Sequence, residues 1–170
     1  MRAAAVTLGL ACAAWLAGVA PAFAWDIFTF PDAKFAAQFP TEPQMTAAKY
    51  RTTAGLEAPA QRWWTKEGNV AYSVTLVDFS GTALEKDAAI ADAVKAFGQD
   101  GEVLVDVEAR INAEWGRELS VNRRDGGHDI VAIFYFDNHL YVLNGRAAPP
   151  DPGAATAKLI RFQQSLNFMR

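Results

Sequence analysis

Cysteine is almost absent from this chain of 170 residues, because Cys12 is its single cysteine. One cysteine cannot form a disulfide within the chain, so no covalent cross-link can stabilise the fold. Cys12 also lies in an apolar N-terminal segment, and the chain after it offers no thiolate nucleophile or thiolate metal ligand. The fold must therefore depend on its hydrophobic core, for which the length of one ordinary domain is sufficient.

Strong charge of either sign is also lacking. The chain has 16 Lys and Arg residues against 19 Asp and Glu residues, and its formal net charge is −3. The basic residues are scattered, and Arg123 and Arg124 form the one adjacent pair. Binding to nucleic acid or to an anionic membrane needs a cluster of positive charge. We therefore expect neither of these partners.

The first 24 residues predict a cleaved signal peptide. Arg2 is followed by an apolar run over residues 3–20, and the segment 22–24 ends in a small-x-small pattern. This order of one positive charge, an apolar core and small residues is what a signal peptidase recognises. We expect cleavage after Ala24, a mature chain that begins at Trp25, and a periplasmic or secreted protein.

Two alternatives to cleavage have less support. A membrane-spanning helix needs about 20 apolar residues and does not usually carry a cleavage site at its end. Cys12 could accept a lipid, but Gly9 stands where a lipoprotein signal has a large aliphatic residue. After cleavage no segment is expected to insert stably into a membrane.

Short strands are predicted through the first half of the mature chain. The segment 70–79 alternates most clearly, because Val70, Tyr72, Val74 and Leu76 fall on one face of an extended chain. Pro59 and a loop at Gly55 are expected to separate the third strand from the fourth. The five predicted strands cover residues 26–30, 34–39, 47–53, 61–66 and 70–79.

A helix is predicted next, over residues 83–97, where large apolar residues recur at helical spacing. Thr82 is the expected N-cap, Glu85 completes a capping box, and Gly98 is the expected C-terminal stop. Four strands then follow over residues 102–111, 115–122, 129–136 and 139–144. A second helix is expected over residues 154–164, after the proline-rich loop 146–153.

The later strands show three patterns that predict which residues are buried and where the chain turns. Val103, Val105 and Val107 are expected on the core side of their strand. The segment 129–136 is apolar nearly throughout, as in a central strand covered on both faces. A two-residue turn is expected after it, at positions 137 and 138. The whole pattern predicts an α+β fold, residues 25–170 forming one domain around a central antiparallel sheet of about six to seven strands with helices packed on its faces.

Three short motifs resemble the PsbP-like family. Residues 35–43, FAAQFPTEP, are similar to the F-x-V-x-F-P-x-x-P opening of that family. Residues 115–118, WGRE, resemble its G-R-E strand, and residues 161–168, RFQQSLNF, resemble its closing R-F-x-x-S-F helix. The resemblance implies a PsbP-like α/β/α sandwich and a binding or assembly role rather than an enzyme. It does not extend to oxygen evolution or to the metal ligands of the plant photosystem subunit.

No catalytic constellation stands out. Ser80 lacks the G-x-S-x-G context of a nucleophile elbow. Asp106 and Glu108 share one strand face, as an acid and a base could, but are interpreted as the solvated side of that strand. The one histidine and carboxylate cluster consists of His128, Asp129, Asp137 and His139. Its two histidines should lie about 25 Å apart along the hairpin, too far to share a metal ion. We expect no catalytic residue, metal ligand or cofactor.

Aromatic residues and prolines provide the candidate binding residues. Trp63 and Trp64 point to opposite faces of one strand, and a slip of one residue would exchange them, so either ring could be exposed. The leading hypothesis is an exported, non-enzymatic accessory domain that binds a protein partner through an edge strand or through Trp63, Trp64, Pro149 and Pro150. The alternative is a small-molecule or lipid binder with a pocket between sheet and helix, lined by Tyr72, Phe97, Phe134 and Tyr141.

Overall fold

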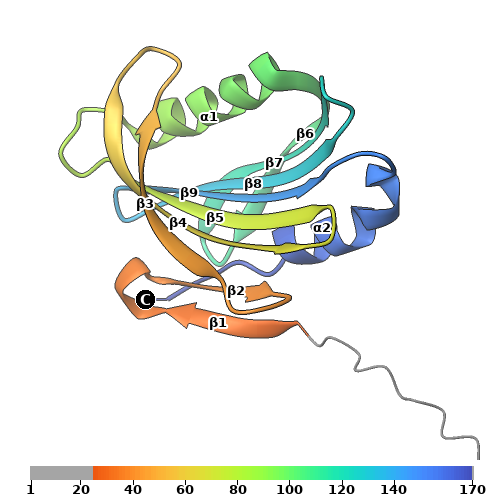
Figure 1. Cartoon of the computed structure of the whole chain (residues 1–170). Helices are drawn as coiled ribbons and strands as arrows, with labels where there is room; N and C mark the ends of the chain where they lie inside the picture. The colour runs from red at the N-terminus through yellow and green to blue at the C-terminus, as the bar shows by residue number, and fades with distance from the viewer. Residues whose placement is uncertain (1–24, 170) are drawn as a thin grey trace, which may run out of the picture.

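The computed structural model describes residues 25–169, which fold around one large antiparallel sheet (Figure 1). The predicted signal peptide and Cys12 lie outside the described residues. Within residues 25–169, no helix is long and apolar enough to cross a membrane.

The elements form runs of strands interrupted by two helices, the order expected for an α+β fold. The first half contains β1 Asp26–Phe30, β2 Phe35–Phe39, β3 Gln44–Arg51, β4 Glu57–Glu67, β5 Val70–Asp78 and α1 Lys86–Asp100. The second half contains β6 Gly101–Ile111, β7 Glu114–Arg123, β8 His128–Phe136, β9 His139–Ala147, α2 Thr156–Gln163 and β10 Asn167–Phe168. Two short 3-10 helices precede β2 and α2, at Pro31–Ala33 and Pro152–Ala155.

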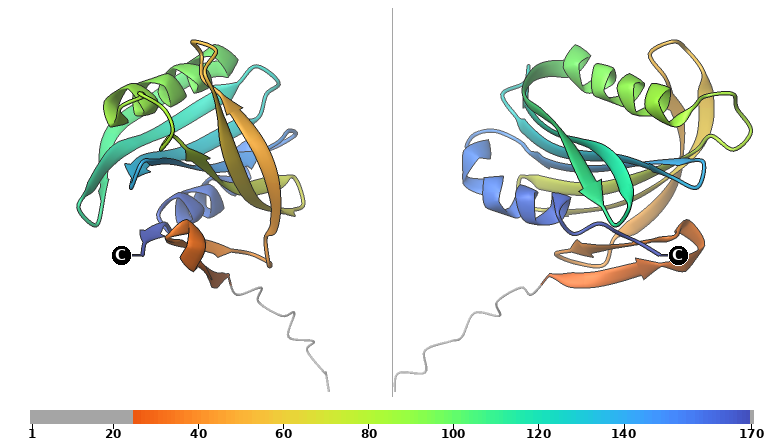
Figure 2. Two further views of the ribbon diagram at one scale, coloured as in Figure 1. Left: turned by 90° about the vertical axis from the view of Figure 1, so that its left-hand side faces the viewer. Right: turned by 180° about the vertical axis from the view of Figure 1, so that it is seen from behind.

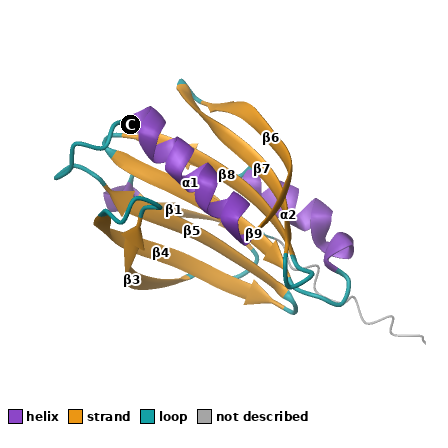
Figure 3. Ribbon diagram, turned by 90° about the horizontal axis from the view of Figure 1, so that it is seen from above, coloured by secondary structure: helices purple, strands orange, loops and turns teal. Residues whose placement is uncertain are grey.

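The large sheet has seven strands in the order β3-β4-β5-β9-β8-β7-β6, with every neighbouring pair antiparallel. A smaller sheet, β1-β2-β10, is separate from it. Figures 1 and 2 show α1 on one face of the large sheet, and α2 with the small sheet on the other. The view from above in Figure 3 shows α1 lying over the large sheet and running roughly along its strands. The predicted antiparallel sheet with helices on its faces is confirmed.

Side chains on alternate residues of each strand form two cores, one on each face of the large sheet. On the α2 side, Tyr72, Val74, Phe134 and Tyr141 are buried with residues of α2 and the small sheet. On the α1 side the core contains these buried side chains of the strands and of α1: Ala58, Ala60, Val77, Phe79, Ala89, Ile90, Ala93, Leu119, Val121, Val131, Ile133, Tyr135, Leu140 and Val142. The predicted alternation of β5 and the two-sided burial of β8 are both confirmed.

Trp63 connects the small sheet to the large one. Its side chain is 7 % exposed, and its ring centre lies 5.3 Å from that of Phe30 and 5.1 Å from that of Phe35. Trp64, the next residue, lies on the opposite face of β4 and is half-buried. Since aromatic rings bury large apolar areas, this cluster is the main contact holding the small sheet against β4.

Several predicted boundaries are wrong for identifiable reasons. Pro59 does not divide the strands, because pairing between β4 and β5 begins only at Ala60, so the missing N–H of Pro59 breaks no bond to β5. Helix α1 begins at Lys86 because the Thr82 hydroxyl donates to the Phe79 carbonyl and closes a turn ahead of it. Strand β10 was not predicted, since two residues are too few to show a pattern.

Asp129 is a charged group buried in β8 on the α1 side. Its side chain is 1 % exposed, and the guanidinium groups of Arg123 and Arg146 lie 3.5 and 3.9 Å from its carboxylate oxygens. Ion pairs at these distances replace the lost hydration only in part. Desolvation therefore raises the pKa of Asp129, while the two arginines act in the opposite direction.

Trp63→Ala should destabilise the protein far more than Trp64→Ala. Removing the buried indole leaves a cavity between the sheets and should lower the free energy of unfolding by about 3–5 kcal/mol. Removing the half-buried Trp64 should lower the free energy of unfolding by less than about half of that amount, because its side chain buries less apolar area. Urea denaturation of the two variants measures both values. Equal losses would place both tryptophans in the core and contradict the observed register.

The pH dependence of stability should contain a contribution from Asp129. Because the folded-state pKa is raised above the unfolded value, the folded protein holds a proton more tightly, and stability falls as pH rises from about 4 through the raised pKa. Each unit of that rise corresponds to about 1.4 kcal/mol. Asp129→Asn lacks this titration, so the variant should gain stability relative to the parent between pH 4 and pH 7. Urea denaturation at both pH values tests this, and an unchanged difference would contradict it.

Candidate functional site

Strand β6 lies at one end of the large sheet and follows directly after α1. The chain reverses at Gly101, where a Cβ atom would lie 2.3 Å from the carbonyl oxygen of Asn122. Only glycine fits so close to the backbone of β7, and this contact sets where β6 begins. Within residues 25–169, no strand pairs with the outer edge of β6.

A β-bulge at Leu104 changes which side chains of β6 face each side of the sheet. Val103 pairs with Val121, but Val105 pairs with Ser120, so one residue of β6 is extra. Val103 therefore packs on the α1-side core, whereas Val105 and Val107 point to the α2 side. The prediction that the three valines share the core face is wrong, because a bulge shifts the alternation by one residue.

The second consequence of the bulge is exposed apolar surface. Helix α2 packs on β8 and β9 and does not reach β6. Eight large apolar side chains are exposed in residues 25–169, and four of them gather on β6 and at the start of β7. They are Leu104, Val105, Val107 and Trp115, exposed by 51, 45, 47 and 54 %. Val105 and Val107 point to the α2 side, whereas Trp115 lies on the α1 side of the sheet. We call these four residues together the β6 patch, which therefore includes both faces at this end of the sheet.

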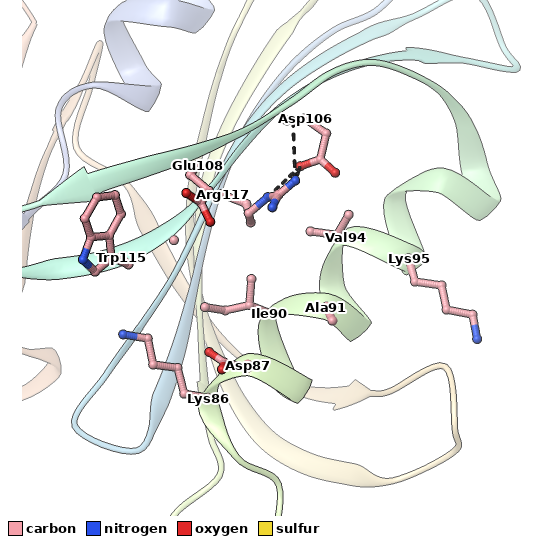
Figure 4. A pocket seen from close by; sticks show the side chains of 11 residues that line it. Lys86, Asp87, Ile90, Ala91, Val94, Lys95, Asp106, Glu108, Trp115 and Arg117 are labelled. Carbon is pink, nitrogen blue, oxygen red and sulfur yellow. Dashed lines mark hydrogen bonds and ion pairs between the residues drawn. The ribbon is translucent and has the colours of Figure 1, made fainter.

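On the α1 side, β6 and β7 form an open cleft with α1 (Figure 4). The cleft has a volume of about 550 Å³. Asp106 and Glu108 share this face, as predicted, and the Arg117 guanidinium lies 2.6 Å from Asp106. The remaining lining consists of Lys86, Asp87, Ile90, Ala91, Val94, Lys95, Trp115 and Gly116. The two carboxylates are exposed, as predicted for the solvated side of the strand, and they border this open cleft.

The charges of the cleft are only partly paired. Lys86 lies 3.6 Å from Glu114, and the Arg110 guanidinium stands over the Trp115 ring at 5.5 Å from its centre. Glu108 is exposed, and in the described part of the chain it forms no ion pair with a basic side chain. The cleft thus has one carboxylate directly on the open edge strand that is available to a cation.

On the opposite face of the same strands, Glu118 stands beside Val107 in the register. Desolvation raises the pKa of the Glu118 carboxyl. Next along β7, the Ser120 hydroxyl lies 3.3 Å from Nε2 of His128. This face is therefore apolar at the edge and polar one strand inward.

The other end of the large sheet differs in character. Strand β3 is exposed along nearly its whole length, but Met45 is its one large exposed apolar side chain. Lys49 and Arg51 on this strand are charges of the kind that protect an edge from further pairing. The two edges of the sheet are thus unequal, and apolar exposure is concentrated at β6.

The four residues predicted to form a partner surface do not all lie on a surface. Trp63 is buried beneath the small sheet, because the register turns it toward Phe30 and Phe35. Trp64 is half-buried, while Pro149 and Pro150 are exposed in the loop after β9.

The four residues predicted to line a pocket are divided by the sheet. Tyr72, Phe134 and Tyr141 are packed in the α2-side core, where the Tyr141 hydroxyl donates to the Ala33 carbonyl. Phe97 lies on α1 across the sheet, at a smaller cleft of about 290 Å³. A common pocket for all four is therefore wrong, because their side chains point to opposite faces.

The histidine and carboxylate residues singled out from the sequence are spread along the β8–β9 hairpin. The β8–β9 hairpin turns at Asp137 and Asn138, both with positive φ, which confirms that prediction. His128 and His139 lie at opposite ends of this hairpin. Within residues 25–169, no three His, Cys, Asp or Glu side chains are grouped to hold a metal ion.

His139 lies near Ser80 through a shared contact with Asp78, which the sequence did not indicate. The Ser80 hydroxyl donates to Asp78 at 2.5 Å, and Nε2 of His139 lies 3.8 Å from the same carboxylate. The hydrogen bonds of Ser80 are the main cause of the lowered pKa of Asp78. In a hydrolytic triad the histidine lies between serine and aspartate. Here the aspartate lies between the other two, so histidine cannot accept the serine proton in this arrangement.

Comparison with known proteins identifies a fold. Neither a protein-family model nor a curated protein sequence matches the chain. The solution structure of cyanobacterial PsbP from Synechocystis matches with a TM-score of 0.55 and 11 % identity, over 89 % of this chain and 95 % of that one. A crystal structure from Pseudomonas aeruginosa, of a protein of unknown function described as a putative regulator, matches with a TM-score of 0.41, 10 % identity and coverages of 79 and 90 %. On the first likeness, this chain has a PsbP-like fold, as its sequence motifs predict.

Proposed function

We propose that this chain is an exported, non-enzymatic accessory protein that binds a protein partner through the β6 edge of its large sheet. The observation that carries the proposal is the β6 patch, whose four exposed apolar side chains lie on the two faces of the sheet at its open edge. The proposal replaces Trp63 by this edge as the contact surface. It keeps the accessory role that the PsbP-like resemblance implies.

Edge strands explain why this surface favours a protein partner. An unpaired strand offers a row of backbone N–H and C=O groups to an added strand, and proteins usually protect such edges with charge or cover. The β6 edge also carries charged residues, but exposed apolar side chains lie between and beside them. Exposed apolar surface costs free energy in water, and a partner that covers it recovers that free energy.

A non-enzymatic role is supported by the arrangement of the polar groups. Asp78, Ser80 and His139 are ordered in a way that does not activate the serine. Asp106, one of the three carboxylates of the α1-side cleft, is held by Arg117. Export is supported by the signal-peptide pattern of the first 24 residues.

Site-specific photocrosslinking in the organism that encodes the chain tests the proposed function. A photoreactive amino acid at Val105 or at Val107 should capture the same protein, because both side chains lie at the proposed contact. The matched control is Ala48, which is exposed on the opposite edge strand β3 and should capture nothing above background. Mass spectrometry identifies the captured protein and shows whether residues 1–24 have been removed.

Two further results would complete this test. Capture at Val107 should be lost when Leu104 is replaced by aspartate, while the free energy of unfolding changes by no more than about 0.5 kcal/mol, as for other surface substitutions. Equal capture at Ala48 and Val107, or no capture at Val107, would contradict the proposed function. Recovery of the uncleaved chain from the cytoplasm would contradict export.

A further inference from the structure

We infer that the partner contributes an extended segment in which basic side chains alternate with apolar ones, and that this segment adds to β6 as an eighth strand of the large sheet. The inference rests on the proposed function and names the chemistry of the partner. It follows from the two faces that β6 presents on either side of its open backbone edge.

The open backbone edge of β6 requires the partner segment to be an extended strand. Strand β6 runs for eleven residues, Gly101–Ile111, and its outer edge is unpaired within residues 25–169. After the bulge at Leu104, residues 105–111 pair with β7 in unbroken register. This regular stretch is long enough for an added strand of ordinary length, about five to six residues.

The two faces of β6 indicate which residue types the added strand carries at alternate positions. In an antiparallel or parallel addition, residues next to each other across the strands share a face of the sheet. Side chains beside Val105 and Val107 meet apolar surface that is almost half exposed. Side chains between them project to the α1 side, beside Asp106 and Glu108 at the cleft. Apolar and basic residues in alternation match both faces.

The charge of β6 itself favours basic rather than acidic residues, while Lys86 and Lys95 of α1 line the far side of the cleft. Strand β6 carries the carboxylates of Glu102, Asp106 and Glu108 against the single guanidinium of Arg110, which stands over Trp115. Arg117 is occupied by Asp106, and Glu108 forms no ion pair with a basic side chain of the described residues. An added lysine or arginine beside Glu108 would supply the missing cation.

The same charges disfavour a second copy of this chain as the occupant. Two copies of β6 paired antiparallel about Val107 would set Asp106 of each beside Glu108 of the other. Antiparallel pairing centred on Asp106 would place it beside Asp106 of the second copy, and pairing centred on Glu108 would place it beside Glu108 of the second copy. Like charges directly opposite each other destabilise a strand pair. The acidic residues of β6 thus act against self-association in these three registers and for a basic partner strand.

Titration of the ¹⁵N-labelled protein with designed peptides tests the inference. One ten-residue peptide alternates lysine with valine, and its counterpart alternates glutamate with valine. The lysine peptide should bind more tightly, and the chemical-shift changes it causes should concentrate in residues 101–111. In Glu108→Lys the preference should reverse, with affinity for the lysine peptide reduced about threefold or more, as expected for a cross-strand charge pair that becomes repulsive.

Glu42→Lys is the matched control, because Glu42 is exposed in the loop before β3 and the substitution changes the net charge equally. This variant should keep the affinity and the preference of the parent protein. Equal binding of both peptides to parent and Glu108→Lys, shifts centred on β3, or dimerisation through β6 without peptide would each overturn the inference. If the inference fails while crosslinks at Val105 and Val107 persist, the proposed function stands with a different partner chemistry. If those crosslinks are absent, the proposed function fails independently of the peptides.

Discussion

The alternation of side chains along each strand is the constraint on which this structure depends. Neighbouring residues point to opposite faces, so a seven-stranded sheet of apolar residues needs a cover on both sides. Helix α1 covers one face, and α2 with the small sheet covers the other (Figure 2). These covers protect the central strands β5, β9 and β8, but the cover on the α2 side ends before Val105 and Val107. The exposed apolar surface of β6 is the part of the sheet that the chain leaves uncovered.

Where the alternation is regular, the sequence predicted the fold well. The alternating apolar residues from Val70 to Leu76 correctly predicted β5, and the continuous apolar run at 129–136 correctly predicted β8. The order of the predicted strands and helices gave the correct fold class. The turn at Asp137 and Asn138 was also predictable, because both residue types tolerate positive φ. These features depend on local residue types and on spacing, which the sequence displays directly.

Where the structure depends on register or on long-range packing, the sequence was insufficient. The bulge at Leu104 reverses the faces of β6, and no glycine or proline next to Leu104 marks it. The burial of Trp63 rather than Trp64 depends on contacts with Phe30 and Phe35, about thirty residues earlier in the chain. The exposure of Val105 and Val107 depends on the position of α2, which packs mainly on β8 and β9. One sequence signal was available, since three valines beside three carboxylates in residues 102–108 are unusual for a covered strand.

The central claim is that a strand from another protein completes the open edge of β6. Amide hydrogen exchange of the protein in its isolated complex, compared with the free protein, measures this most directly, because pairing protects backbone amides whatever the side chains do. The account predicts slower exchange for residues 101–111 in the complex and unchanged exchange for β3. Protection confined to β3, to the loop at Pro149 and Pro150, or to α1 would contradict it.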